Sequence, residues 1–358
     1  MLQKAEDRRE DRDKEETMRI VTFRLGLLTV GLLSLTLALG MAAPRARAAD
    51  LTPFKIGISA PVVTIFPVWM AEAGGFYERE GLKVEVINME GGTRGLQVLL
   101  SGEIQAMHVG LAPAVLANKQ GADLRLVTST CNTIPITMFT KAGVGMADLK
   151  GKTFGISTFG SETDIAIGIL LKQLGLTRQD VTVSQIGGSS QRFGALVAGR
   201  IDVAPLIEPG VTLAKERGFN PIIDLAAAKT PWIFDSVVVT RGYLKQNRDT
   251  LTRFVKAYIA GAYLALSDEK KAKEVIAQRM RVKDQKVLDA SYADFHRLMP
   301  LDAAPTLAGA QNVLEQLVAT GTEIGSSNPN DYLDLSIIEG LRKEGYFEQL
   351  AKTYPVKR

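Results

Sequence analysis

Two successive β-α-β-α series followed by a long helical tail most constrain how this chain can fold. Short β-like runs alternate with helical segments from Phe54 to Phe139, and the pattern begins again at Thr153 and continues to Thr240. From Arg248 onward, nearly every segment has helical spacing. Because alternating strands and helices give parallel strands with right-handed crossovers, the sequence predicts an α/β protein with two parallel-sheet units.

The helical tail predicts how the two units are connected. Its segments at 249–266, 269–280, 283–297, 307–320 and 335–351 are amphipathic, and they are too few to bury their apolar faces alone. We therefore expect the tail to pack on the first unit. This makes lobe one residues 49–138 and 240–358, and lobe two residues 139–239. The chain then crosses between the lobes near 138–145 and 230–240, where a hinge is expected.

The N-terminus has the order of a secretory signal peptide. Arg19 and Arg24 follow Met18, an apolar run covers 25–43, and Ala46-Arg47-Ala48 offers a small-x-small cleavage site. We predict that translation starts at Met18, that residues 1–48 are a leader, and that the mature chain begins at Ala49 in the periplasm. The alternative is an uncleaved membrane anchor, since the apolar run approaches spanning length.

Composition argues against several other classes of protein. Cys131 is the single cysteine, which excludes an intrachain disulfide, a multi-cysteine metal site and lipid attachment at an N-terminal cysteine. The formal net charge is +4 and the pI about 9.0. This balance does not by itself indicate nucleic-acid binding, which requires basic residues clustered on one face. We expect no nucleic-acid partner, no metal and no cofactor.

A series of local patterns carries a resemblance to a known family. The patterns are Phe66–Ala71, Gly75–Leu82, Leu99–Gln105, Asp148–Gly155 and Ala198–Asp202. In this order and spacing, the chain resembles the periplasmic substrate-binding components of ABC importers of the nitrate/sulfonate/taurine type, which share a fold with NMT1/THI5-like proteins. The resemblance covers about residues 53–350. It implies a type II periplasmic binding protein fold, a cleft that closes on a small molecule, and an ABC permease at the inner membrane as partner. We expect a monomer.

Loops at the carboxyl ends of the predicted strands are the candidates for a ligand cleft, because such loops converge at one edge of an open α/β sheet. They are rich in Gly, Ser and Thr, and most lead into a helix whose free N–H groups attract anions. The candidate ligand-binding residues are Ser59, Thr64, Phe66, Trp69, Thr93, Ala112, Thr158, Gly160, Ser161, Glu162, Ser189, Ser190, Gln191, Glu208, Trp232 and Asp235. The alternative for each Ser or Thr is an ordinary helix cap.

The polar candidates have individual expectations. Ser161 could cap a helix while Thr158 donates to a ligand, and Glu162 has a structural alternative in the helix dipole, which we favour slightly. Glu208 follows a buried-looking strand and could accept from an amine or hydroxyl group. Asp235 lies near the second crossing, as a hinge or cleft residue.

Aromatic and basic residues near these loops suggest two further roles. Phe66, Trp69 and Trp232 could line a pocket for an aromatic ligand, although core packing is the favoured alternative for Trp69. Arg192 could form a bidentate pair with an anion, as could Arg94. An arginine near the start of a helix is more often solvated, and we favour that interpretation for both.

Catalytic arrangements are not evident in the sequence. The two histidines, His108 and His296, have no Cys, Asp or His at ligand spacing, and Cys131 fits a small buried residue better than a nucleophile. We therefore expect a non-enzymatic protein that binds a sulfonate, nitrate or carboxylate, or else a pyrimidine-like ring, and delivers it to a permease. The alternatives are an enzyme of the same fold that makes the thiamine pyrimidine, and a ligand sensor for a signalling partner.

Overall fold

The computed structural model describes residues 51–356 together with Met18, and the chain divides into two units between Asp50 and Leu51. The predicted leader over 1–48 and its cleavage site lie outside the described residues, apart from Met18. Among the residues that are described, no helix combines the length and apolar character needed to cross a membrane.

The first sheet holds five strands in the order β2-β1-β3-β10-β4. Their bounds are β1 (Thr52–Ile58), β2 (Leu82–Asn88), β3 (Ala106–Val109), β4 (Leu124–Leu126) and β10 (Ser236–Thr240). Strand β1 pairs in parallel with β2 and β3, whereas β10 is antiparallel to both β3 and β4. Strands β3 and β4 are wholly buried and β10 is nearly so, as strands covered by helices on both sides must be.

The second sheet also has five strands, in the order β7-β6-β8-β5-β9. Their bounds are β5 (Thr137–Thr140), β6 (Thr153–Ile156), β7 (Thr182–Gln185), β8 (Val203–Leu206) and β9 (Asn220–Asp224). Strand β6 is parallel to β7 and β8, and β5 is antiparallel to β8 and β9. The predicted α/β class with two sheets is confirmed, but both sheets are mixed and not wholly parallel.

The antiparallel strands β5 and β10 share one property that explains this difference. Each is the first strand after the chain has passed from one sheet to the other, so no crossover helix fixes its direction. The passages cover 127–136 and 225–235. They lie side by side, and the Phe234 N–H of the second donates to the Cys131 carbonyl of the first at 2.9 Å. The first passage therefore precedes the position expected near 138–145, because residues 137–140 already form a strand of the second sheet.

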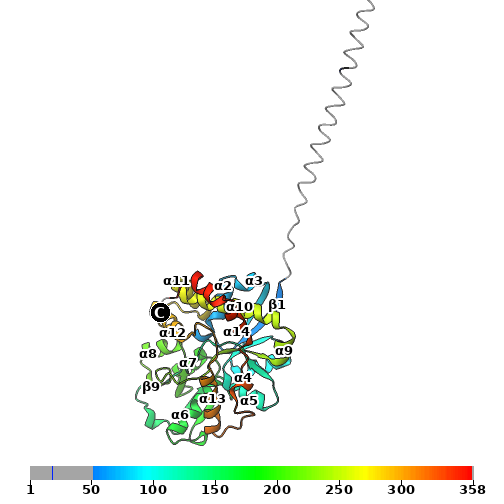
Figure 1. Cartoon of the computed structure of the whole chain (residues 1–358). Helices are drawn as coiled ribbons and strands as arrows, with labels where there is room; N and C mark the ends of the chain where they lie inside the picture. Colours follow the sequence, from blue (N-terminus) through cyan, green and yellow to red (C-terminus); the bar gives the residue numbers. More distant parts are fainter. Residues whose placement is uncertain (1–17, 19–50, 357–358) are drawn as a thin grey trace, which may run out of the picture. The chain divides into compact units, whose positions relative to one another are not determined.

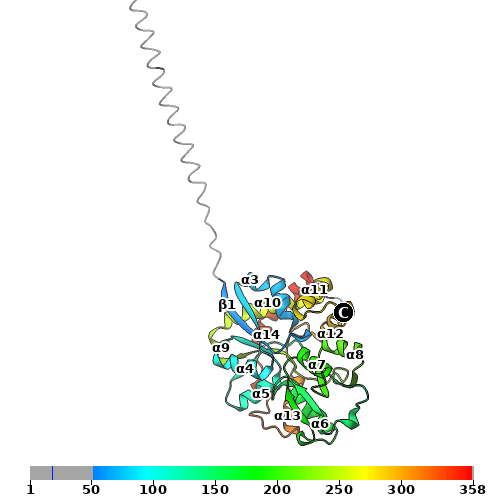
Figure 2. The same ribbon diagram turned by 180° about the vertical axis from the view of Figure 1, so that it is seen from behind.

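Helices cover both sheets (Figure 1 and Figure 2). The strand-connecting helices are α2 (Phe66–Ala73), α3 (Phe76–Arg79), α4 (Gly92–Ser101), α5 (Leu111–Lys119), α6 (Glu162–Gln173), α7 (Ser189–Val197) and α8 (Gly210–Glu216). The tail is α9 (Arg241–Gln246), α10 (Arg248–Ser267), α11 (Glu269–Met280), α12 (Gln285–Leu298), α13 (Leu307–Ala319), α14 (Ser336–Lys343) and α15 (Tyr346–Thr353).

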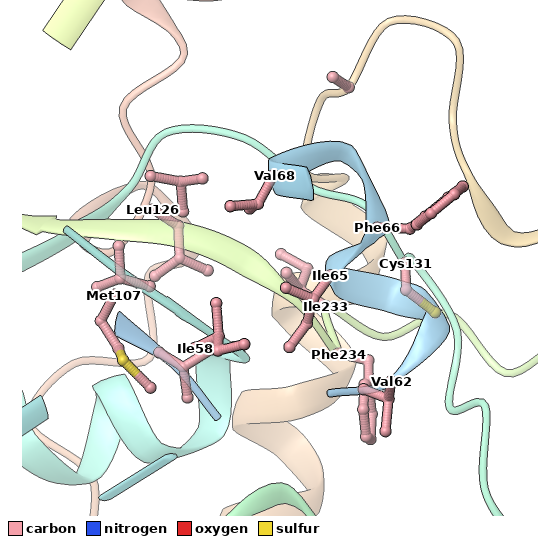
Figure 3. Close-up of a cluster of buried hydrophobic side chains, with 14 of the residues drawn as sticks. Ile58, Val62, Ile65, Phe66, Val68, Met107, Leu126, Cys131, Ile233 and Phe234 are labelled. Carbon is pink, nitrogen blue, oxygen red and sulfur yellow. The ribbon is translucent and has the colours of Figure 1, made fainter. Parts of the chain in front are cut away.

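The tail packs on the helices of the first sheet, as predicted. Helix α10 crosses α2 so closely that a Cβ on Gly261 would lie 2.5 Å from the Ala71 backbone nitrogen, which only glycine allows. Helix α13 packs on α5, and α12 reaches towards the second sheet, where Lys286 pairs with Glu216 of α8 at 3.3 Å. The core below this layer includes Ile58, Val62 and Phe234 (Figure 3), which come from β1, the loop after it and the second passage.

Candidate functional site

A small cavity of about 50 Å³ lies where strand ends of both sheets meet. Larger hollows occur on the surface, one of about 570 Å³ between α6 and the end of α13, but that one lies on the helical layer. The small cavity is walled by the loops after β1, β3, β6 and β8, by the first turns of α4, α6 and α7, and by the second passage. Its lining is Ser59, Ala60, Val62, Gly92, Val109, Gly110, Ser157, Ser161, Glu162, Thr163, Ser189, Arg192, Ile207, Phe234 and Asp235.

Five of the predicted site residues line this cavity: Ser59, Ser161, Glu162, Ser189 and Asp235. They come together because the carboxyl ends of parallel strands share an edge and the two edges face each other. Their roles towards a ligand remain predictions. The predicted cap is confirmed, since the Ser161 hydroxyl accepts from the Asp164 N–H at 3.4 Å.

Glu162 connects parts of the chain that belong to different sheets. It begins α6, yet its Oε1 accepts from the Ala112 N–H at the start of α5 at 3.1 Å, and its Oε2 accepts from the Trp232 indole N–H at 2.8 Å. Its side chain is only 8% exposed. Burial raises the pKa of Glu162 to about 8; the bonds from Trp232 and Ala112 oppose this rise, and Asp235 adds to it.

The raised pKa predicts a pH dependence of stability. The folded state holds the Glu162 proton up to about pH 8, whereas an exposed glutamate loses it near 4.5. The stabilisation is therefore complete below pH 4.5 and is lost as the pH rises through 8. Chemical denaturation of wild type and Glu162→Gln should show the wild-type unfolding free energy falling faster between pH 5 and 8, by up to about 1.4 kcal/mol per pH unit. Parallel curves for the two proteins would contradict the assignment.

Arg192 is the site residue that sequence reasoning misjudged. It was expected to be solvated, but it is 2% exposed and lines the cavity. Its Nε donates to the Pro205 carbonyl at 2.8 Å and its Nη1 to the Gly187 carbonyl at 2.5 Å. Burial lowers its pKa to about 9, so it stays charged at neutral pH. Within residues 51–356 no carboxylate forms an ion pair with it. The sequence does contain one indication of this burial. Leu196 lies four residues after Arg192, and this helical spacing places Arg192 on the buried face of α7.

Asp235 is held from behind the cavity by a buried polar network. The Thr64 hydroxyl donates to its Oδ2, and His108 Nδ1 lies 3.5 Å from its Oδ1. His108 Nε2 in turn lies 3.0 Å from the hydroxyl of Tyr258 in α10. Thr64 was predicted to contact ligand, but it lies behind Asp235 and does not line the cavity. The network fixes the Asp235 carboxylate as a rigid part of the wall.

The aromatic candidates do not line the cavity, and their roles towards a ligand remain predictions. Phe66 and Trp69 belong to the buried core on α2, where Phe66 packs edge-on against Phe295 at 5.1 Å between ring centroids. Trp232 is buried and its indole N–H is bonded to Glu162. Almost all of α2 is buried, so the aromatic side chains of its first turn are directed to the core instead of the cleft.

The remaining candidates lie around the cavity without lining it. Glu208 caps α8, because its two oxygens accept from the N–H and hydroxyl of Thr212 at 3.2 and 2.8 Å. The Gly160 N–H donates to Asp164 at 2.9 Å, and Ser190 and Gln191 are exposed. Ala112, Thr93 and Thr158 contact the opposite side of the cleft and not the cavity itself.

Three contacts show how tightly the two sides of the cleft meet. The Thr93 hydroxyl donates to the Phe159 carbonyl at 3.0 Å. A Cβ on Gly91 would lie 2.5 Å from Thr158 Cγ2, and one on Gly188 would lie 3.1 Å from Ala60 Cβ. Glycine at 91 and 188 therefore allows the loops of one sheet to approach those of the other.

A family model described as NMT1/THI5 like matches residues 63–272. The putative binding protein YtlA of Bacillus subtilis (strain 168) is 24% identical over 331 residues, which cover 90% of this chain and 98% of YtlA. The riboflavin-binding protein RibY of Chloroflexus aurantiacus is 27% identical over 227 residues, covering 61% of this chain and 63% of RibY. Both relatives are named as binding proteins.

Solved structures have the same fold at low sequence identity. The alkanesulfonate-binding protein SsuA from Xanthomonas axonopodis pv. citri superposes with a TM-score of 0.65 at 18% identity, covering 80% of this chain and all of SsuA (100%). The desulfurization enzyme DszB superposes with a TM-score of 0.60 at 15% identity, covering 81% of this chain and 99% of DszB. The same architecture thus supports both binding and catalysis, so the residues of the cavity must decide between them.

Proposed function

Because the chain belongs to the NMT1/THI5-like family, we propose that it is an extracytoplasmic solute-binding protein that captures a small molecule in the cavity between its two sheets and hands it to an ABC permease. The two lobes of this proposal are built on the two sheets, and the paired passages at 127–136 and 225–235 form the hinge. Relatives named as binding proteins support the binding role.

The observation that carries the proposal is the buried guanidinium of Arg192 in the cavity wall. A buried charge is costly unless it is paired, and backbone carbonyls occupy only two of the five N–H donors of this side chain. An anionic group of the ligand supplies the missing partner. Serine and threonine hydroxyls at 59, 157, 161, 163 and 189 lie on the same wall and can rotate to donate. The ligand class that fits is a small carboxylate, sulfonate or nitrate.

Capture works by closure of the cleft. Ligand bound to one side adds contacts to the other only in the closed form, so it shifts the equilibrium towards closure. The permease would recognise the closed shape. Since cargo must also be released, we expect micromolar affinity, about −8 kcal/mol.

A thermal-shift screen of the chain from Ala49 onward tests this function. The panel contains organic sulfonates, nitrate, carboxylates, pyrimidines, riboflavin and amino acids, applied to protein stripped of carried-over ligand by unfolding and refolding. A ligand at one hundred times its Kd stabilises the native state by about 2.7 kcal/mol. A shift with one anionic class is the expected result. A shift with pyrimidines or riboflavin alone would overturn the anion assignment, and no shift with any compound would overturn the binding function for these classes.

An enzyme like DszB is the alternative that the fold permits. Catalysis needs a nucleophile or base that can reach the ligand. Cys131 is buried, its thiol donates to the Thr133 carbonyl at 3.1 Å, and burial raises its pKa to about 12. His108 is enclosed by Asp235 and Tyr258. These environments favour structural roles for both residues and support the binding function.

A further inference from the structure

The start of helix α5 is a position for a hydrogen-bond acceptor, and the protein itself has filled it. A helix start leaves four N–H groups without an intrahelical partner, and in α5 the three positions within the helix are residues 111–113. The Leu111 N–H donates to the Ile233 carbonyl at 3.0 Å, and residue 113 is a proline, which has no N–H. The Ala112 N–H donates to Glu162. No N–H donor of residues 111–113 is therefore left for a ligand.

The carboxyl group of Glu162 fits this position closely. A Cβ on Gly110 would lie 2.0 Å from Glu162 Oε1, so the glycine is what lets the carboxyl group reach the helix start. The Trp232 indole N–H completes the position from the second passage. Glu162 does not cap α6, the helix that it begins. Ser161 caps α6, and Asp164 accepts from the Gly160 N–H just before it.

We propose that Glu162 is a specificity-determining residue: its carboxyl group permanently occupies the α5 start, excludes the acidic group of the ligand from it, and leaves Arg192 as the ligand's anion partner. The occupancy of the α5 start stands on the contacts of Glu162 alone. Only the consequence for the ligand rests on the proposed function.

Chemical rescue tests the occupancy. Glu162→Ala leaves a carboxyl-sized space with two unpaired donors, at Ala112 and Trp232, and formate has the size and acceptors to fill it. The sequence contains two tryptophans, so in a Trp69→Phe background the fluorescence comes from Trp232 alone. We expect Glu162→Ala to melt earlier than wild type, and formate to restore its melting temperature and its Trp232 emission.

Two matched variants define what counts as rescue. Glu162→Gln keeps the space filled, so its response to formate should be at least tenfold weaker than that of Glu162→Ala. Adding Arg192→Gln to Glu162→Ala should leave the formate response unchanged. If Glu162→Ala does not fold alone, it is purified in formate, and unfolding on removal of formate is then the expected result.

Specific results would overturn the proposal. The first is a Glu162→Ala protein that is as stable as wild type, and the second is a Glu162→Ala protein whose stability formate does not change. The third is a rescue that disappears when Arg192→Gln is added, because that result would place formate at Arg192. If Glu162→Ala cannot be folded even in formate, Glu162→Gln tests the proposal instead. The amide changes the group that accepts from the Trp232 indole, so its Trp232 emission must differ from that of wild type, and an unchanged emission would contradict the proposal. The ligand screen on wild type is independent of these results, so failure of one leaves the other standing.

Discussion

Replacing Arg192 by glutamine should abolish high-affinity binding of the anionic ligand. The guanidinium is buried in the cavity wall, and two of its N–H groups are already held by the Pro205 and Gly187 carbonyls. Removing one partner of a buried charge pair costs about 2–5 kcal/mol, which is about 30- to 5,000-fold in Kd. Titration calorimetry with the ligand class found in the screen measures this loss directly.

The controls for Arg192 separate loss of charge from loss of fold. Arg217 lies outside the cavity, and its guanidinium lies over the ring of Phe193, which belongs to the same helix as Arg192. The Arg217→Gln protein should therefore bind the ligand as wild type does. Arg192→Lys keeps the charge but cannot reproduce the planar fork that holds both carbonyls, so its affinity should be intermediate. A folded Arg192→Gln protein with wild-type affinity for the anion would refute the role of this residue.

The two α/β units and the packing of the tail could be predicted because they follow from local periodicity. The alternation of strands and helices fixed the class, and the excess of amphipathic helices after Arg248 required a surface to cover. The direction of β5 and β10 could not be predicted in the same way. Direction after a passage between sheets depends on where the strand re-enters, which involves residues far apart in the sequence.

The cavity residues were predictable where they depend on strand ends and unpredictable where they depend on helix faces. Ser59, Glu162 and Ser189 follow strands, and the topology alone brings such positions together. Arg192 lies within a helix, where a one-residue difference in the buried face moves a side chain from solvent to core, and its burial was not predicted. The Glu162–Trp232 contact joins residues 70 apart, and no local pattern announces it.

Glu208 has a partner within the protein, Thr212, and its role towards a ligand remains a prediction. Thr212 is the third residue of α8, which begins at Gly210, so Glu208 lies before the helix and its carboxyl group reaches the first turn from outside. A cap of this kind satisfies the carboxyl group without any ligand. The buried-looking strand before Glu208 was correctly recognised, but it does not by itself direct the side chain that follows into the cleft.

Gly91→Ala should weaken ligand binding by holding the cleft open. Gly91 has an extended backbone, with φ 162° and ψ 140°, so alanine brings no strain of its own. The three atoms nearest to its Cβ would all belong to Thr158 on the opposite side of the cleft, the nearest being Cγ2 at 2.5 Å. Overpacking of this kind costs about 1–3 kcal/mol, and in the proposed mechanism it falls on the closed form alone, which corresponds to about 5- to 150-fold in Kd.

The closing contact can be tested by a compensating change. Thr158→Ala leaves only a Cβ, 3.4 Å from the new methyl group, so Gly91→Ala/Thr158→Ala should regain most of the lost affinity. Small-angle X-ray scattering with ligand should show a larger radius of gyration for Gly91→Ala than for the double variant. Gly194→Ala, which has open space around its Cβ, is the matched control. If Gly91→Ala binds as wild type does, or if Thr158→Ala gives no recovery, ligand is not held in the closed form in which Gly91 meets Thr158.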